Sequence, residues 1–67
     1  MKKSENGPAP GTWAKHGEHT YEVVGTVTHN RVPFVRYRLR GQGIVHRMAL
    51  SAWRAIWSQA TERGLPQ

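Results

Sequence analysis

The segment 32–40, VPFVRYRLR, is the feature that most constrains the fold, because basic side chains stand at every second position of its second half. Successive side chains of a β-strand point to opposite faces of the sheet. A strand through this segment turns Val35, Tyr37 and Leu39 to one face. Its other face carries one aromatic and three basic side chains: Phe34, Arg36, Arg38 and Arg40. The chain is therefore expected to build a sheet with one apolar and one basic face.

The residues that follow predict a second strand in a fixed register. Gly41-Gln42 fits a two-residue type II′ turn with Gly first, and residues 44–50 then form a strand. This turn pairs Leu39 with Ile44, Tyr37 with His46, Val35 with Met48 and Arg36 with Arg47. Apolar residues meet on one face and Arg residues on the other, whereas a slip by one residue would mix the two sets.

The residues that precede predict a third strand over 20–28, TYEVVGTVT, which is rich in β-branched side chains. A three-residue loop at 29–31, with Asn30 accepting positive φ, pairs Gly25 with Val35 and Glu22 with Arg38. Thr26 then shares the basic face. Residues 12–16, around Trp13, are a candidate for one further short strand.

A single amphipathic helix is expected to cover the apolar face of this sheet. Ser51 is the predicted N-cap, and Gly64 and Pro66 are expected to stop the helix. Between these ends, four apolar residues recur at helical spacing and form one stripe: Trp53, Ile56, Trp57 and Ala60. The predicted fold class is α+β: a three- to four-stranded antiparallel sheet backed by one C-terminal helix. The alternative is an SH3-like barrel with a C-terminal helix.

The chain length limits the organisation to one small domain. It has 67 residues and no Cys, so neither disulfides nor thiolate metal sites support a core that buries only about 60% of the unfolded surface. We expect a disordered basic, Pro-rich arm at 1–11, one domain at 12–64 and a tail at 65–67. No apolar run suits a membrane span or a signal peptide, which predicts a cytoplasmic protein. A homodimer is an alternative to a monomer, because a small core supplies little stability on its own.

The charge distribution points to an anionic partner. The chain has ten Lys and Arg but only four acidic residues, all Glu, and no acidic residue lies between Glu22 and Glu62. Every basic residue in that stretch is Arg, whose planar guanidinium suits phosphates and base edges. We therefore expect nucleic-acid binding, with DNA ranked ahead of RNA. The alternative is an effector that binds and inhibits a host protein with an acidic surface through the same face.

The candidate binding residues are those on the open basic face and at its rim. Four Arg on the face are the expected contacts: Arg36, Arg38, Arg40 and Arg47. Phe34 is a candidate for stacking on a base, and Arg31 and Lys15 are candidates for phosphate contacts at the rim. Lys2 and Lys3 are candidates for loose phosphate contacts from the arm.

The predicted order, with VPFVRYRLRGQGIVHRM as a basic hairpin and SAWRAIWSQA as a helix, resembles a known DNA-binding layout. It is similar to the N-terminal DNA-binding domains of some tyrosine integrases and to the plant ethylene-response type domain. In these families the sheet lies in the major groove and a helix backs it. The stretch 11–40 also looks like the opening of a small SH3-like barrel, a type found among short phage and plasmid proteins. That resemblance implies a phage- or plasmid-encoded regulator.

Enzymatic and metal-dependent functions are not expected. Zinc sites need three or four ligands at recognisable spacing, whereas His16, His19, His29 and His46 are scattered and Cys is absent. Catalysis needs titratable groups that meet, yet Glu22 and His46 are predicted on opposite faces of the sheet. The sequence therefore predicts neither a cofactor, nor a metal, nor a catalytic residue.

Overall fold

The computed structural model describes residues 7–66 and consists of one antiparallel five-stranded sheet with a single α-helix near the C-terminus. In chain order the elements are β1 (Trp13–His16), β2 (His19–His29), β3 (Val32–Leu39), β4 (His46–Ala49), α1 (Leu50–Gln59) and β5 (Glu62–Gly64). The α+β prediction is confirmed. The expected extra strand around Trp13 exists as β1, and the fifth strand, β5, was not expected.

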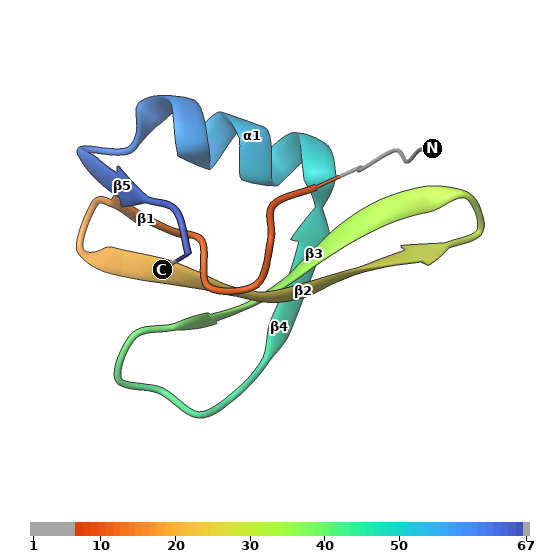
Figure 1. The fold of residues 1–67 in the computed structure, drawn as a ribbon, viewed down its shortest axis with the longest axis horizontal. Helices are drawn as coiled ribbons and strands as arrows, with labels where there is room; N and C mark the ends of the chain where they lie inside the picture. The colour runs from red at the N-terminus through yellow and green to blue at the C-terminus, as the bar shows by residue number, and fades with distance from the viewer. Residues whose placement is uncertain (1–6, 67) are drawn as a thin grey trace.

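The strands lie side by side in the order β4-β3-β2-β1-β5 (Figure 1). The chain leaves β4, crosses one face of the sheet as α1, and returns to pair β5 with β1 at the opposite edge. Figure 1 shows α1 along one side of the sheet, and the loop between β3 and β4 extends away from it. We call the sheet face that packs on α1 the inner face and the opposite one the outer face.

The β2–β3 hairpin departs from the predicted register at its tip. His29 pairs with Val32, so the loop has two residues, Asn30 and Arg31, with φ values of 52° and 67°. These positive φ angles at both central positions are those of a type I′ turn, whose twist matches that of the strands. The predicted three-residue loop is therefore wrong, although Asn30 does take positive φ.

A β-bulge at Val24 restores the predicted register in the other half of this hairpin. The pairing shifts between Val23 and Gly25, so that Glu22 faces Arg38 as predicted while Thr26 faces Val35. The expected pairing of Gly25 with Val35 is wrong, because the bulge inserts one unpaired residue. Thr26 consequently lies on the inner face, not on the basic face.

The β3–β4 pairing has the predicted register but a different connection. Tyr37 faces His46, Arg36 faces Arg47 and Val35 faces Met48. The predicted turn centred on Gly41-Gln42 is wrong: the Gln42 amide donates to the Leu39 carbonyl at 2.9 Å, so the β-turn lies one residue earlier and Gly41, at φ 88°, is its third residue.

The whole connection between β3 and β4 covers residues 40–45, and it shortens the predicted strand at 44–50. Ile44 does not pair with Leu39 and is 65% exposed, and β4 begins only at His46. The chain also enters α1 directly from the sheet. Ala49, not Ser51, is the N-cap, and it makes no side-chain hydrogen bond.

The core lies between α1 and the inner face. Its buried apolar side chains are Ala14, Val23, Val35, Leu50 and Trp53. Tyr21, Met48, Ile56, Trp57 and Ala60 pack against them as partly buried neighbours. The predicted helical stripe therefore faces the sheet, as expected.

The two ends of the described chain meet the same part of the sheet. The Gly11 amide donates to the Val23 carbonyl at 3.0 Å, and the Val23 amide donates to the Thr12 carbonyl at 2.8 Å. On the other side of β1, the Thr61 amide donates to the Lys15 carbonyl at 2.9 Å and leads into β5. Residues 1–6 of the predicted arm, with Lys2 and Lys3, and Gln67 of the predicted tail lie outside the described residues.

Arg31→Gly is expected to raise the free energy of unfolding by about 0.5–1 kcal/mol, because glycine adopts positive φ without a clash of its own side chain. Thermal melting followed by circular dichroism measures the change. Gly41→Ala, at φ 88°, is the opposite substitution and should lower the melting temperature. A less stable Arg31→Gly variant would contradict the type I′ turn.

Trp53→Ala is expected to cost about 3–5 kcal/mol, because Trp53 is 3% exposed at the centre of the core. Trp57 is only half-buried, so Trp57→Ala should cost clearly less. Urea unfolding of both variants provides the comparison. An equal or larger loss for Trp57→Ala would place the helix in a different rotation on the sheet.

Candidate nucleic-acid interface

The outer face brings the predicted Arg residues together across two strands. Cross-strand pairs place side chains on the same face, and Val35 and Val23 of the same strands are buried under α1. The alternate positions of β3 therefore point outward, together with Arg47 of β4. The predicted contacts on this face are thus all present: Arg36, Arg38, Arg40, Arg47 and Phe34.

Arg36 and Arg47 form a like-charge pair at the far end of this face. They are direct cross-strand partners, and both are exposed. Such a pair is unfavourable by up to ~1 kcal/mol. The Arg47 guanidinium lies 4.8 Å from the centre of the Phe34 ring, and this cation–π contact offsets part of the repulsion. Within residues 7–66, no carboxylate forms a salt bridge with either guanidinium.

Glu22 is the carboxylate that lies among these cations. Its Oε2 accepts a hydrogen bond from Arg40 Nε at 2.6 Å, and its Oε1 lies 3.5 Å from Arg38 Nε. The hydrogen bond from Arg40, with the charges of both Arg, holds the pKa of Glu22 below its ordinary value, against a smaller opposing effect of burial. Both Arg side chains stay more than half exposed. Glu22 thus occupies the position in which another anionic oxygen would meet them.

Trp13 is a functional candidate that the sequence analysis did not identify as such. It opens β1, pairs with Glu22 on one side and Gly64 on the other, and so lies on the outer face. A Cβ at position 64 would overlap the indole, so the ring lies directly against the β5 backbone. The Arg40 guanidinium stands 5.4 Å from the ring centre. The sequence offers one signal for this placement, the alternation of side chains along a strand. Ala14, the next residue, is buried in the core, so Trp13 lies on the opposite face.

A hollow of about 450 Å³ lies beside this ring on the outer face. Its walls are side chains of three neighbouring strands and the backbone at the bulge, namely Gly11, Trp13, Glu22, Val23, Val24, Arg38 and Arg40. The bulge at Val24 and the Gly11 segment were not predicted, and they shape this hollow.

The rim candidates lie at opposite ends of the sheet. Lys15 lies on β1, pairs with Thr20 of β2 and shares the outer face with Trp13. Arg31 lies in the type I′ turn at the tip of the long hairpin. Thr26 faces inward, as described above. In the part of the chain that the structure describes, no group of three or more His, Cys, Asp or Glu could hold a metal ion.

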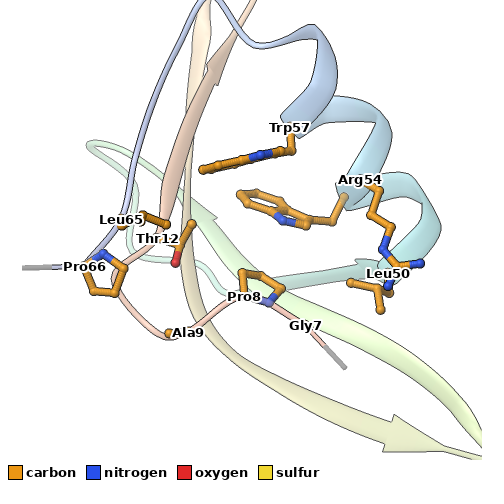
Figure 2. A pocket seen from close by; sticks show the side chains of 10 residues that line it. Gly7, Pro8, Ala9, Thr12, Leu50, Arg54, Trp57, Leu65 and Pro66 are labelled. Carbon is orange, nitrogen blue, oxygen red and sulfur yellow. The ribbon is translucent and has the colours of Figure 1, made fainter. Parts of the chain in front are cut away.

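Two further features lie on the side of α1. A hollow of about 620 Å³ opens between α1 and the chain ends, with mainly apolar walls from Pro8, Leu50, Trp53, Trp57, Leu65 and Pro66 (Figure 2). A row of rings crosses the inner face next to the helix, with centres 5.4 Å apart for Tyr21 and Tyr37 and 5.5 Å apart for Tyr37 and His46. Neither feature carries a cluster of charge.

Comparison with known proteins adds no assignment to this geometry. No protein-family model, no curated protein and no solved structure matches the chain. Over residues 7–66, α1 is the helix present, and it is too short and too polar to cross a membrane.

Glu22→Gln is expected to reduce stability near neutral pH and to flatten its acid dependence. The ionised carboxylate gains two guanidinium partners only on folding, so its folded-state pKa lies below the ordinary 4.5. The stabilisation is complete above that value and is lost as the pH falls through the lower folded-state pKa. Melting temperatures measured from about pH 6 to about pH 3 should converge for wild type and variant.

Glu18→Gln, in the exposed turn between β1 and β2, is the matched control for removing one acid. Parallel pH profiles for wild type and Glu22→Gln would contradict the ion-pair assignment.

Proposed function

We propose that this protein binds nucleic acid through the outer face of its sheet. The observation that carries the proposal is the set of four exposed Arg on the face that α1 leaves uncovered. Two of them share Glu22, and the other two oppose each other with no carboxylate bridge among the described residues. Neutralising phosphates releases counterions from the nucleic acid, which gives such a surface most of its affinity. A cytoplasmic role as a small phage- or plasmid-encoded regulator, with DNA ranked ahead of RNA, belongs to the same proposal.

Energetics support a partner for this face. The repulsion between Arg36 and Arg47 is a cost that a small domain carries poorly when residues 7–66 supply five buried apolar side chains. A phosphate between the two guanidinium groups would turn that repulsion into binding energy. Arg38 and Arg40 would exchange Glu22 for phosphate oxygens without a change of fold, because all three groups already lie at the surface.

The second candidate is a protein-binding effector that blocks a host protein through this face. Exposed Val27 and Val32 lie beside Phe34 on the outer face at the hairpin end, and Arg and aromatic side chains are enriched at protein interfaces. An acidic partner surface would meet the same Arg cluster.

The combined substitution Arg36→Ala and Arg47→Ala is expected to weaken nucleic-acid binding strongly. Each lost phosphate contact should lower the slope of log affinity against log salt by roughly 0.7–0.9. The same variant should be as stable as wild type or slightly more stable, because the like-charge pair is gone. Fluorescence anisotropy with labelled DNA and RNA over a salt series measures affinity and slope together.

Arg54→Ala is the matched control, since Arg54 is exposed on α1 and away from the outer face. It should change the slope less than either single substitution, Arg36→Ala or Arg47→Ala. If wild type binds neither DNA nor RNA at about 0.1 M salt, and one protein is retained from nuclease-treated lysate, the effector proposal replaces this one.

A further inference from the structure

We infer that the outer face takes single-stranded nucleic acid, with unpaired bases stacking on Trp13 and Phe34, in preference to a duplex. This inference rests on the proposed function and names its substrate class. Both rings belong to the outer face, and each lies next to an Arg guanidinium, at 5.4 Å for Trp13 with Arg40 and 4.8 Å for Phe34 with Arg47. Aromatic rings beside cations are the common elements of single-strand binding surfaces.

Trp13 is placed for contact with a ligand and not for the core. Its neighbour Ala14 is completely buried, so the β1 backbone fixes the indole on the opposite side of the sheet. Gly64 lets the ring lie against the β5 backbone, and this contact restricts its movement on that side. A ring held in this way loses little conformational freedom when a base stacks on it.

The Arg40 contact with Trp13 is exchangeable. Arg40 is 57% exposed at its side chain, and its guanidinium is shared between Glu22 and the indole. A cation–π contact with an exposed cation contributes less than a stacked base does. A base would therefore displace Arg40 from the ring, and the guanidinium would be free to meet the adjacent phosphate. The hollow beside Trp13, of about 450 Å³, gives the base a place to enter.

The spacing of the two rings favours separated bases. From Trp13 to Phe34 the sheet extends over two strand spacings and four residues of β3, a Cα separation of about 16 Å. Successive bases of one strand in B-DNA are about 3.4 Å apart and stacked on one another. Duplex base faces are covered by their neighbours, so only a strand with unstacked bases can use both rings.

The width of the sheet disfavours readout of a duplex groove. At the level of Trp13, four backbones lie side by side through Gly64, Trp13, Glu22 and Arg38. Three strand spacings span about 14 Å, whereas the major groove of B-DNA is about 12 Å wide. The sheet at this level is therefore too wide to enter the major groove and carry its Arg side chains to the bases. A flexible single strand can lie across the same surface.

The test compares an unstructured oligothymidylate, an oligouridylate and a hairpin duplex with the same number of phosphates, at about 0.1 M salt. Wild type should bind at least one of the single strands about tenfold or more tighter than the duplex. Trp13→Leu keeps apolar bulk but removes the ring, and should weaken single-strand binding about 5- to 150-fold, the range of one base–aromatic stack. Trp13→Tyr keeps a ring and should stay within about threefold of wild type.

A second readout covers the case in which Trp13→Leu does not fold. Single-strand binding should quench tryptophan fluorescence in wild type, and the quenching should shrink in Trp13→Tyr. Duplex binding as tight as single-strand binding, a folded Trp13→Leu variant with wild-type affinity, or undiminished quenching in Trp13→Tyr would each overturn the inference and leave nucleic-acid binding in place. Absence of binding to all three probes would overturn the proposed function as well.

Discussion

The burial of Trp53 against the sheet is the interaction on which the rest of the structure depends. In a 67-residue chain without Cys, this indole with Val35, Val23, Leu50 and Ala14 makes up the buried apolar core. One helix can cover only one face of a sheet, so the packing that stabilises the fold also leaves the opposite face in water. The Arg-bearing positions of β3 lie on that face because they alternate with buried Val35.

The outer face combines one repulsive pair of charges with two attractive ones. Arg36 opposes Arg47, while Glu22 holds Arg38 and Arg40 in place. Glu22 serves the folded protein as an internal anion, and phosphate would compete with it for the same guanidinium groups. If the proposed function holds, the affinity for nucleic acid is set by the difference in free energy between the ion pairs with Glu22 and those with phosphate. The proposed binding is then expected to depend on salt and on the charge state of Glu22.

Two small backbone features decide which side chains share the outer face. The bulge at Val24 moves Thr26 to the inner face and brings Val27 outward beside Phe34. Gly64 lets the Trp13 ring lie against the β5 backbone, next to the cross-strand row that continues through Glu22 to Arg38. The aromatic part of the surface therefore depends on β5, a three-residue strand that follows the helix.

The sequence by itself determined the alternation of β3, its pairing with β4 through Arg36 and Arg47, and the apolar stripe of the helix. These are local or nearest-neighbour patterns, in which side-chain periodicity and the burial of one face admit a single register. Only the tertiary structure decided the bulge at Val24, the late start of β4, and the pairing of β5 with β1 that sets Trp13 beside Arg40. A bulge leaves no periodic signal, and the ERG segment of β5 lacks any strand pattern of its own. Its pairing arises because α1 returns the chain to the free edge of β1, whose backbone groups require partners.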